Sequence, residues 1–483
     1  MTRMRIALSL VFLAACSAPS TPRAAEPDGP TLDARFTGAT LRFDYDHVGT
    51  AAAEHIAPHG YRIEGPWAGS TTILEDPSGL GLYRFVVRDA SSSAILWSRG
   101  FCSIFGEWAT TGPAKTAWRS FQESQRFPEP VAPVVLALEK RDERGAFREF
   151  WRGDLDPKSR FVDRTPLMPG ITPIEFEVNG PPTTQVDLLL LAEGYTLFGQ
   201  EKFEADARRM IEALFATEPW KSRRGDVSVR GLFGSAGSFT NGISNPRKAV
   251  WQRSAFGTSF NAFDSDRYVL TYEDRRLREI AAQAPYDALA ILIDDRKYGG
   301  GGIYNLWTTA TVDTEPAEYV FVHELGHSFA GLADEYYTSQ VAYESLQQPG
   351  TEPWEPNTTA LLDPQQLKWR DLVDAATPLP TPWRQTEYDA ADLAYQARRQ
   401  ELIARGASEE ENEALMRSVR ETSGPFLASE RFSSSVGAFE GSMYAAKGLY
   451  RPAADCIMFT RNPVPFCAVC RRAIDRAIDL YTR

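Results

Sequence analysis

Two patterns of apolar and polar residues divide this chain. From about residue 31 to 165, short segments alternate apolar and polar side chains with a period of two, which is typical of half-buried strands; the clearest are 40–45, 82–87, 94–97, 134–138 and 147–151. Turn-forming residues at 89–93 and 142–145 separate two pairs of these segments and predict hairpins. Short strands joined by turns predict an all-β sandwich, and the Pro-rich segment 165–173 marks its end.

From about residue 175 to 483 the pattern changes to alternating strands and helices. Continuous apolar runs predict buried strands at 186–191, 227–233, 288–293 and 306–312. Helical periodicity appears at 200–216 and again near the C-terminus at 467–481. Residues 387–420 are dense in charge and predict two helices that form a solvated excursion beside the core. We expect an α+β domain, layered as α/β/α, over 175–483.

The first sixteen residues predict a secretory signal. Two arginines precede a short apolar run that is too brief to span a membrane as a mature helix. The run ends in LAAC at residues 13–16, which resembles the bacterial lipobox; the resemblance implies that Cys16 becomes the lipidated first residue. Ser17 is not the aspartate associated with inner-membrane retention, so the predicted location is the outer membrane or cell surface of a Gram-negative bacterium. Residues 17–30 are rich in Ser, Pro, Thr and Ala and predict a flexible tether, while an ordinary signal peptide is the alternative.

Charge and length narrow the range of partners. The net charge of −12 argues against nucleic acid, because phosphate binding needs clustered Lys and Arg. The 483 residues are enough for two domains with sizeable cores. No stretch beyond the leader is apolar enough for a spanning helix, so a membrane is expected to be a partner only through the lipid.

Four cysteines follow Cys16, and three of them lie close together near the C-terminus: Cys456, Cys467 and Cys470. Export favours disulfides, so we predict a bridge from Cys456 to one member of the Cys467/Cys470 pair. That pair could instead hold a metal, but the sequence shows no obvious partners for a site with four ligands.

The chemistry is concentrated in the sequence HELGHSFAGLADEY at residues 323–336. His323 and His327 are four residues apart and lie on one face of a helix, so both imidazoles can hold one zinc ion. Glu324 between them can act as the general base towards water bound to that ion. The alternative, two histidines satisfied within a core, is weakened because the chain has only five histidines and its catalytic half places its only two here.

Zinc in a catalytic site needs a third protein ligand and an open position. No histidine follows His327, so the third ligand must be a carboxylate. Asp334 is the first choice, because Gly331 can end the helix and let the chain turn back. Glu335 is the runner-up and Glu440 is the third option.

The chain resembles the bacterial IgA-peptidase family of zinc metallopeptidases. The likeness covers most of the sequence and rests on these segments together: FQESQRFPEP at 121–130, LLAEGY at 190–195, YGGGGIY at 298–304, the motif at 323–336, Pro356-Asn357, Lys368-Trp369, Glu440-Gly441, GLYRP at 448–452, Cys456 to Met458 and FCAVC at 466–470. The family in turn resembles metzincins, which implies that Met458 lies in a turn beneath the metal. The chain departs from metzincins in two ways, because Gly331 and Asp334 stand one residue late and the third ligand is no histidine.

We therefore expect an exported, lipid-anchored zinc endopeptidase that acts on protein or peptide, with a β-sandwich before a metzincin-like domain. Nothing in the sequence indicates an antibody-binding site, so immunoglobulin is not expected in particular. The alternative is a surface-anchored binding or adhesion lipoprotein with a structural or degenerate metal site, although such a module has no need of Glu324. A carbohydrate-active lipoprotein is a third possibility, for which the sequence offers no suitably placed pair of carboxylates.

Overall fold

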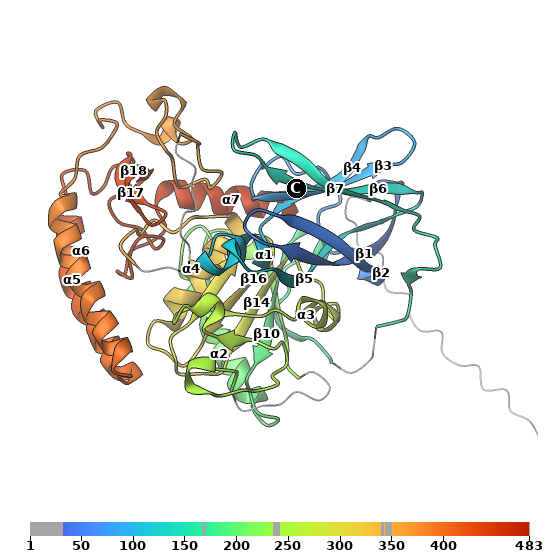
Figure 1. Cartoon of the computed structure of the whole chain (residues 1–483), viewed down its shortest axis with the longest axis horizontal. Coiled ribbons are helices and arrows are strands. Elements are labelled where there is room, and N and C mark those ends of the chain that lie inside the picture. The colour runs from blue at the N-terminus through green and yellow to red at the C-terminus, as the bar shows by residue number, and fades with distance from the viewer. Residues whose placement is uncertain (1–31, 168–170, 235–241, 340–341, 343–349, 483) are drawn as a thin grey trace, which may run out of the picture.

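The computed structural model describes residues 32–167, 171–234, 242–339, 342 and 350–482. The predicted signal peptide, Cys16 and the tether lie outside these residues. Figure 1 shows a β-rich N-terminal region beside a mixed α/β region, with a pair of helices at the far side of the latter. Within the described part of the chain, no helix is long and apolar enough to cross a membrane.

The N-terminal region contains two four-stranded sheets. The first has the order β5-β1-β2-β8, from the strands β1 (Phe36–Gly49), β2 (Glu54–Pro66), β5 (Arg119–Pro130) and β8 (Val162–Asp163). The second has the order β4-β3-β6-β7, from β3 (Tyr83–Asp89), β4 (Ile95–Phe101), β6 (Val134–Arg141) and β7 (Phe147–Leu155). The β3–β4 and β6–β7 pairs are the two predicted hairpins.

Aromatic side chains from both sheets share one core. Phe43 of the first sheet stacks on Trp151 of the second at 5.1 Å between ring centroids and lies 6.3 Å from Phe85. These rings belong to a single cluster of buried residues from both sheets. One face of each sheet therefore lies in a common interior.

The C-terminal region is organised around a six-stranded sheet of order β15-β16-β14-β10-β11-β9. Its strands are β9 (Ile174–Glu177), β10 (Val186–Glu193), β11 (Val227–Leu232), β14 (Ala288–Ile293), β15 (Gly300–Ile303) and β16 (Trp307–Thr311). The four central strands are parallel, and the edge strands β9 and β15 are antiparallel to their neighbours. Two small hairpins complete the strands: β12 (Ser259–Phe260) with β13 (Val269–Leu270), and β17 (Phe439–Ser442) with β18 (Ala445–Arg451).

Both faces of this sheet are covered, which explains its continuous apolar runs. Leu188 and Leu190 of β10 pack in one core with the helices α2 (Gln200–Phe215), α4 (Ala317–Ala330) and α7 (Ala468–Thr482). Leu189 and Leu191 point to the opposite face, in a core that also contains α3 (Asp274–Ala281) and the N-terminal helix α1 (Ile104–Ala109). The N-terminal region therefore covers one face of the C-terminal sheet and shares a core with it (Figure 1).

The charged segment forms the two predicted helices, α5 (Gln385–Ala404) and α6 (Glu409–Ala428). They run side by side at the edge of the molecule (Figure 1). A capping box starts α6, in which the Ser408 hydroxyl accepts from the Glu411 N–H and the Glu411 carboxylate accepts from the Ser408 N–H. Apolar residues of the hairpin still reach the body of the protein, since Tyr388 contacts Phe459 at 5.3 Å between ring centroids.

Candidate metal centre

Helix α4 carries the HELGH motif and has well-defined ends. Pro316 occupies the position before its first turn, and Gly331 ends it with a φ of 63°, a left-handed conformation that glycine adopts without steric cost. The apolar residues around the motif bury the helix against the sheet, as Val320, Phe321 and Leu325 are almost fully inaccessible. The helix end lets the chain reverse, so that Asp334 returns to the histidines.

His323, His327 and Asp334 bring three donor atoms together at one point. Nε2 of His323 lies 3.1 Å from Nε2 of His327, and Asp334 Oδ1 lies 3.0 Å and 3.2 Å from these two nitrogens. Ligands at about 2.0–2.1 Å from a tetrahedral ion are about 3.3 Å apart, so the spacing fits a small divalent cation. Two imidazoles and a carboxylate form the kind of three-ligand set found in catalytic zinc sites.

Backbone carbonyls orient both imidazoles. Nδ1 of His323 lies 3.0 Å from the Ile457 carbonyl oxygen, and Nδ1 of His327 lies 2.5 Å from the Leu332 carbonyl oxygen. A carbonyl only accepts, so each Nδ1 carries a proton, and each Nε2 is the nitrogen that faces the centre and would bind a metal. Such outer contacts fix the tautomer and the ring direction that a metal requires.

Asp334 is held by the tip of the β17–β18 hairpin. Tyr444 donates its hydroxyl hydrogen to Asp334 Oδ2, which leaves Oδ1 facing the histidines. The Met443 N–H donates to the Asp334 carbonyl at 3.0 Å, which fixes the backbone of the same residue. Met443 and Tyr444 are the two central residues of the turn, and both have positive φ, 46° and 62°. Non-glycine residues in that conformation cost about 1–3 kcal/mol each, which points to a functional reason for this turn.

Burial and charge compete at these ligands. Burial disfavours the protonated form of His327, yet the nearby Asp334 carboxylate prevails and raises the pKa of His327 to about 9. Burial likewise opposes ionisation of Asp334, but His327 and His323 hold the pKa of this carboxyl well below its usual range. Asp334 is therefore kept as the carboxylate, the form that ligates metals.

Glu324 lies on the open side of the centre, next to the glycine-rich strand β15. A Cβ atom placed on Gly300 would come within 3.2 Å of Glu324 Oε1, and one on Gly302 would overlap the Glu324 carbonyl oxygen. The glycines at 300–302 therefore let an edge strand lie directly against α4. This contact places β15 directly beside the Glu324 side chain.

The centre opens into a cleft of about 380 Å³. Glu324, His327 and Asp334 line it from the C-terminal region, and Glu107 and Lys140 line it from the N-terminal region. The cleft thus lies between the two regions of the chain, and the metal centre is at one of its walls. Its mixture of charged, polar and apolar lining residues suits an extended polar chain better than a small apolar molecule.

Two models of known protein families match the chain. The model described as IgA Peptidase M64 matches residues 174–478, and the model described as Peptidase M64 N-terminus matches residues 31–152. The chain belongs to the M64 peptidase family. No curated protein matches it. The resemblance drawn from the sequence motifs is thereby confirmed, and the chain is a metallopeptidase with a β-rich N-terminal domain and a mixed α/β peptidase domain.

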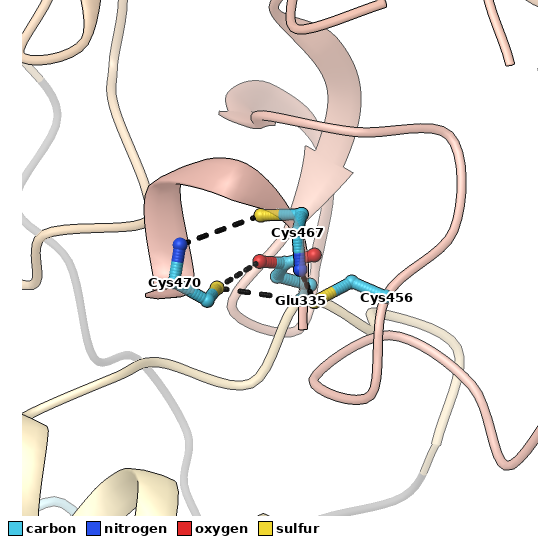
Figure 2. Close-up of side chains that lie close together, drawn as sticks. All are labelled: Glu335, Cys456, Cys467 and Cys470. Atoms are coloured by element: carbon cyan, nitrogen blue, oxygen red, sulfur yellow. Dashed lines mark hydrogen bonds between the residues drawn. The ribbon is translucent and has the colours of Figure 1, made fainter. Parts of the chain in front are cut away.

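The other two carboxylates considered from the sequence point away from the histidines. Glu440 lies near the molecular surface, where it accepts from Lys447 Nζ at 2.9 Å and from the Gly448 N–H at 3.1 Å. Glu335 is fully buried on the opposite side of the chain from Asp334, among the sulfur atoms of the three C-terminal cysteines (Figure 2). Successive side chains of an extended segment diverge, which explains why Asp334 and Glu335 face different centres.

The predicted disulfide is not formed in this structure. Sγ of Cys456 lies 3.8 Å from Sγ of Cys470, whereas a disulfide requires about 2.05 Å. Cys102, Cys456, Cys467 and Cys470 are all free thiols. The sequence shows that Cys456, Cys467 and Cys470 are close together along the chain. It does not show that Glu335 lies beside them.

Met458 packs beneath the metal helix of this M64 peptidase. A Cβ placed on Gly326 would lie 3.2 Å from the Met458 sulfur, so the side chain fits against the glycine between the two histidines. The preceding Ile457 carbonyl is the oxygen that orients His323. The turn at 456–459 therefore supports the ligand helix both by packing and by hydrogen bonding.

Sequence reasoning did not identify several residues that support the site. Tyr444 on Asp334 and Tyr319, whose hydroxyl lies 3.2 Å from His323 Nδ1, are both absent from the sequence-based candidates. Glu355 also lines the cleft, and burial raises its pKa to about 7. Tyr319 precedes His323 by one helical turn, which is a signal that could have found it, whereas nothing local connects Tyr444 or Glu355 to the motif.

An ion pair, and not a cap, ties down the start of α4. Thr314 and Glu315 stand before the helix in the sequence, but no side chain caps its N-terminus in the structure. Glu315 instead forms ion pairs with Arg417 and Arg420 of α6, at 2.6 Å for the latter. Its carboxylate therefore ties the middle of α6 to the start of the metal helix.

Proposed function

We propose that this M64 peptidase is a zinc-dependent endopeptidase with His323, His327 and Asp334 as metal ligands and Glu324 as the general base. The observation that carries the proposal is the convergence of three donor atoms at 3.0–3.2 Å on the wall of a cleft that Glu324 also lines. The fit of the donor set supports zinc, because two nitrogens and one carboxylate oxygen suit a borderline ion in a site with three protein ligands.

The roles of the residues follow from their positions. When bound, zinc lowers the pKa of its water and polarises the substrate carbonyl. Glu324 accepts the proton of the attacking water and returns it to the departing amine, which a carboxylate one residue from His323 can do from the cleft side. Asp334, kept ionised and pinned by Tyr444, holds the third position without drifting towards Glu324.

The cleft supports a peptide as the substrate. Its walls carry acidic Glu107 and Glu355 together with basic Lys140 and Arg267, so it offers partners to both N–H and C=O groups of an extended chain. The glycine strand β15 also lines the cleft and adds backbone groups to that wall. No feature of the cleft selects an immunoglobulin, and we propose a general protein or peptide substrate cleaved within the chain.

The arrangement of elements supports a finer description of the fold. The shared aromatic core of the two N-terminal sheets supports a β-sandwich over 31–165. The turn with Met458 beneath the ligand helix, and the glycine that ends that helix before Asp334, support a metzincin-like domain over 175–483.

A digest of a proteome-derived peptide library tests the function. Purified protein should cleave peptides at internal bonds, a chelator should abolish cleavage, and added zinc should restore it. Sequencing of the new termini would then give the cleavage preference. Peptides that bind but remain intact with a full complement of zinc would overturn the proposal in favour of a binding or adhesion lipoprotein.

We also propose that the protein is exported and anchored to the outer membrane or cell surface by a lipid on Cys16. The support is the sequence LAAC at 13–16 and the tether-like composition of 17–30. Cys16→Ser should leave unprocessed precursor or release soluble protein, as fractionation and mass spectrometry of the N-terminus would show. An unmodified mature terminus downstream of Cys16 would refute the anchor.

A further inference from the structure

We propose that Glu335, Cys456, Cys467 and Cys470 form a second, structural metal site that takes a thiophilic divalent cation such as zinc. The four side chains come from three separate segments, and their ligand atoms all lie within 4.8 Å of one another (Figure 2). The site is distinct from the histidine centre, because none of its ligands is shared with His323, His327 or Asp334. It does not depend on the proposed peptidase chemistry.

The spacing of the ligand atoms matches a tetrahedral metal site. Two sulfurs bound to zinc at about 2.3 Å are about 3.8 Å apart, and a sulfur and an oxygen are about 3.6 Å apart. The Cys456–Cys470 sulfur distance is 3.8 Å, and Cys470 Sγ lies 3.3 Å from Glu335 Oε1. Closed four-ligand sites rich in thiolate are typical of structural zinc.

Backbone N–H groups already face the sulfurs. The Cys467 N–H donates to Cys456 Sγ at 3.3 Å, and the Cys470 N–H donates to Cys467 Sγ at 3.5 Å. The second bond follows from the C-x-x-C spacing at the start of α7, where N–H groups have no partner within the helix. Donors of this kind stabilise thiolates and position them for a metal.

The buried carboxylate of Glu335 supports a cation at this site. Glu335 has no exposed surface, and its Oε2 has no hydrogen-bond partner among the described residues. Asn357 donates to the other oxygen, Oε1, at 2.9 Å, and the buried guanidinium of Arg451 adds a favourable but longer-range charge. A buried carboxylate with an unsatisfied oxygen is expensive, and a metal ion would satisfy it.

A disulfide accounts for these contacts less well. It would join two of the three sulfurs and leave the third thiol and the Glu335 carboxylate buried together without a cation. The observed separation of 3.8 Å would also have to shrink by almost half. A metal ion uses all four groups at close to their present positions.

The second site would brace the first. The Glu335 N–H donates to the Met458 carbonyl at 2.8 Å, so the segment that carries Asp334 is already tied to the turn that carries Cys456. Cys467 and Cys470 add the start of α7. A metal that joins these three segments would fix the loop after Gly331 and, through it, the position of Asp334.

Metal analysis of the purified full chain tests the site. Wild-type protein should hold two zinc ions per chain, and His323→Ala/His327→Ala should hold one. Because the remaining ligands are mostly thiolates, exchange of that ion for Co²⁺ should produce sulfur-to-cobalt charge-transfer absorption in the near ultraviolet. This measurement changes no cysteine, so it stands even where a cysteine variant fails to fold.

Cysteine variants provide the matched comparison. Cys467→Ser/Cys470→Ser should lose one zinc ion and the cobalt–sulfur absorption, whereas Cys102→Ser, a buried cysteine outside the cluster, should keep both. The proposal is overturned if the double-histidine variant is folded but binds neither Zn²⁺ nor Co²⁺. It is also overturned if peptide mapping of exported wild-type protein shows a disulfide between two of the three cysteines.

Discussion

The two ligand clusters of this M64 peptidase lie side by side yet differ in exposure. Asp334 and Glu335 are neighbours in sequence, but Asp334 lies with His327 on the wall of a cleft and Glu335 is buried beside three cysteines. The His327 side chain keeps 14% of its surface exposed, whereas Glu335, Cys456 and Cys470 keep none.

The difference shows how exposure assigns roles to similar ligands. An open cluster leaves a position for water and substrate, and Glu324, the carboxylate that we propose as the base, lines the same cleft. A closed cluster has no such position, and its value lies in the segments that it joins. The following predictions break or sharpen this contrast, from the largest expected effect to the smallest.

Loss of the base should affect only the chemistry of the open cluster. Glu324→Ala should lower kcat/KM roughly 10³-fold while zinc content stays at the wild-type level, because Glu324 is not a ligand. Glu318→Gln is the control, since this exposed residue is on the same helix and away from the cleft. Wild-type turnover by Glu324→Ala would exclude the assigned mechanism.

Substitution of the two neighbouring carboxylates should release different ions. Asp334→Ala should lose the ion held by the histidines, with an affinity loss beyond the 10–100-fold typical of an outer contact. Glu335→Gln should weaken only the cysteine cluster, which cobalt absorption in the near ultraviolet would report. If Asp334→Ala retained stoichiometric zinc at native affinity, Asp334 would not be the third ligand.

A chelator should remove the ions of the two clusters at different rates. The open centre should give up its ion quickly to a small chelator such as dipicolinate, and activity should fall with it. The cysteine cluster should keep its ion until the protein unfolds, because Glu335, Cys456 and Cys470 are fully buried. Simultaneous loss of both ions from folded protein would show that the chelator reaches the two clusters equally well.

Removal of the tyrosine hydroxyl should weaken the open centre alone. Tyr444→Phe removes the donor to Asp334 Oδ2 and should lower metal affinity or activity by about 10–100-fold. Tyr450→Phe, on the adjoining strand β18, is the matched control. Competition titrations with a zinc indicator would measure the change, and equal affinities for the two variants would remove Tyr444 from the site.

The stability of the protein should also depend on the close contact between Gly302 of β15 and the backbone of α4. Gly302→Ala would push a Cβ into the Glu324 carbonyl and should lower the free energy of unfolding by about 1–3 kcal/mol. Gly60→Ala has open space around its Cβ and should change stability little. Denaturant unfolding would compare the two, and equal stabilities would mean that β15 can shift away from α4 without cost.

Local patterns determined much of this protein. Period-two alternation gave the strands of the N-terminal sheets, continuous apolar runs gave β10, β11, β14 and β16, and helical spacing placed His323 and His327 together. Gly331 ends α4, as its tolerance of a left-handed backbone predicts. These features depend on residues a few positions apart, so the sequence is sufficient to predict them.

Only the tertiary structure decided the surroundings of the metal centre. The choice of Asp334 over Glu335 depends on which way each side chain points after the chain reverses, and Tyr444 reaches Asp334 from 110 residues away. The grouping of Glu335 with the cysteines spans up to 135 residues, as in its contact with Cys470. Such contacts arise because packing of the hairpin β17–β18, the turn at 456–459 and α7 against α4 brings distant segments together, and no local periodicity records that packing.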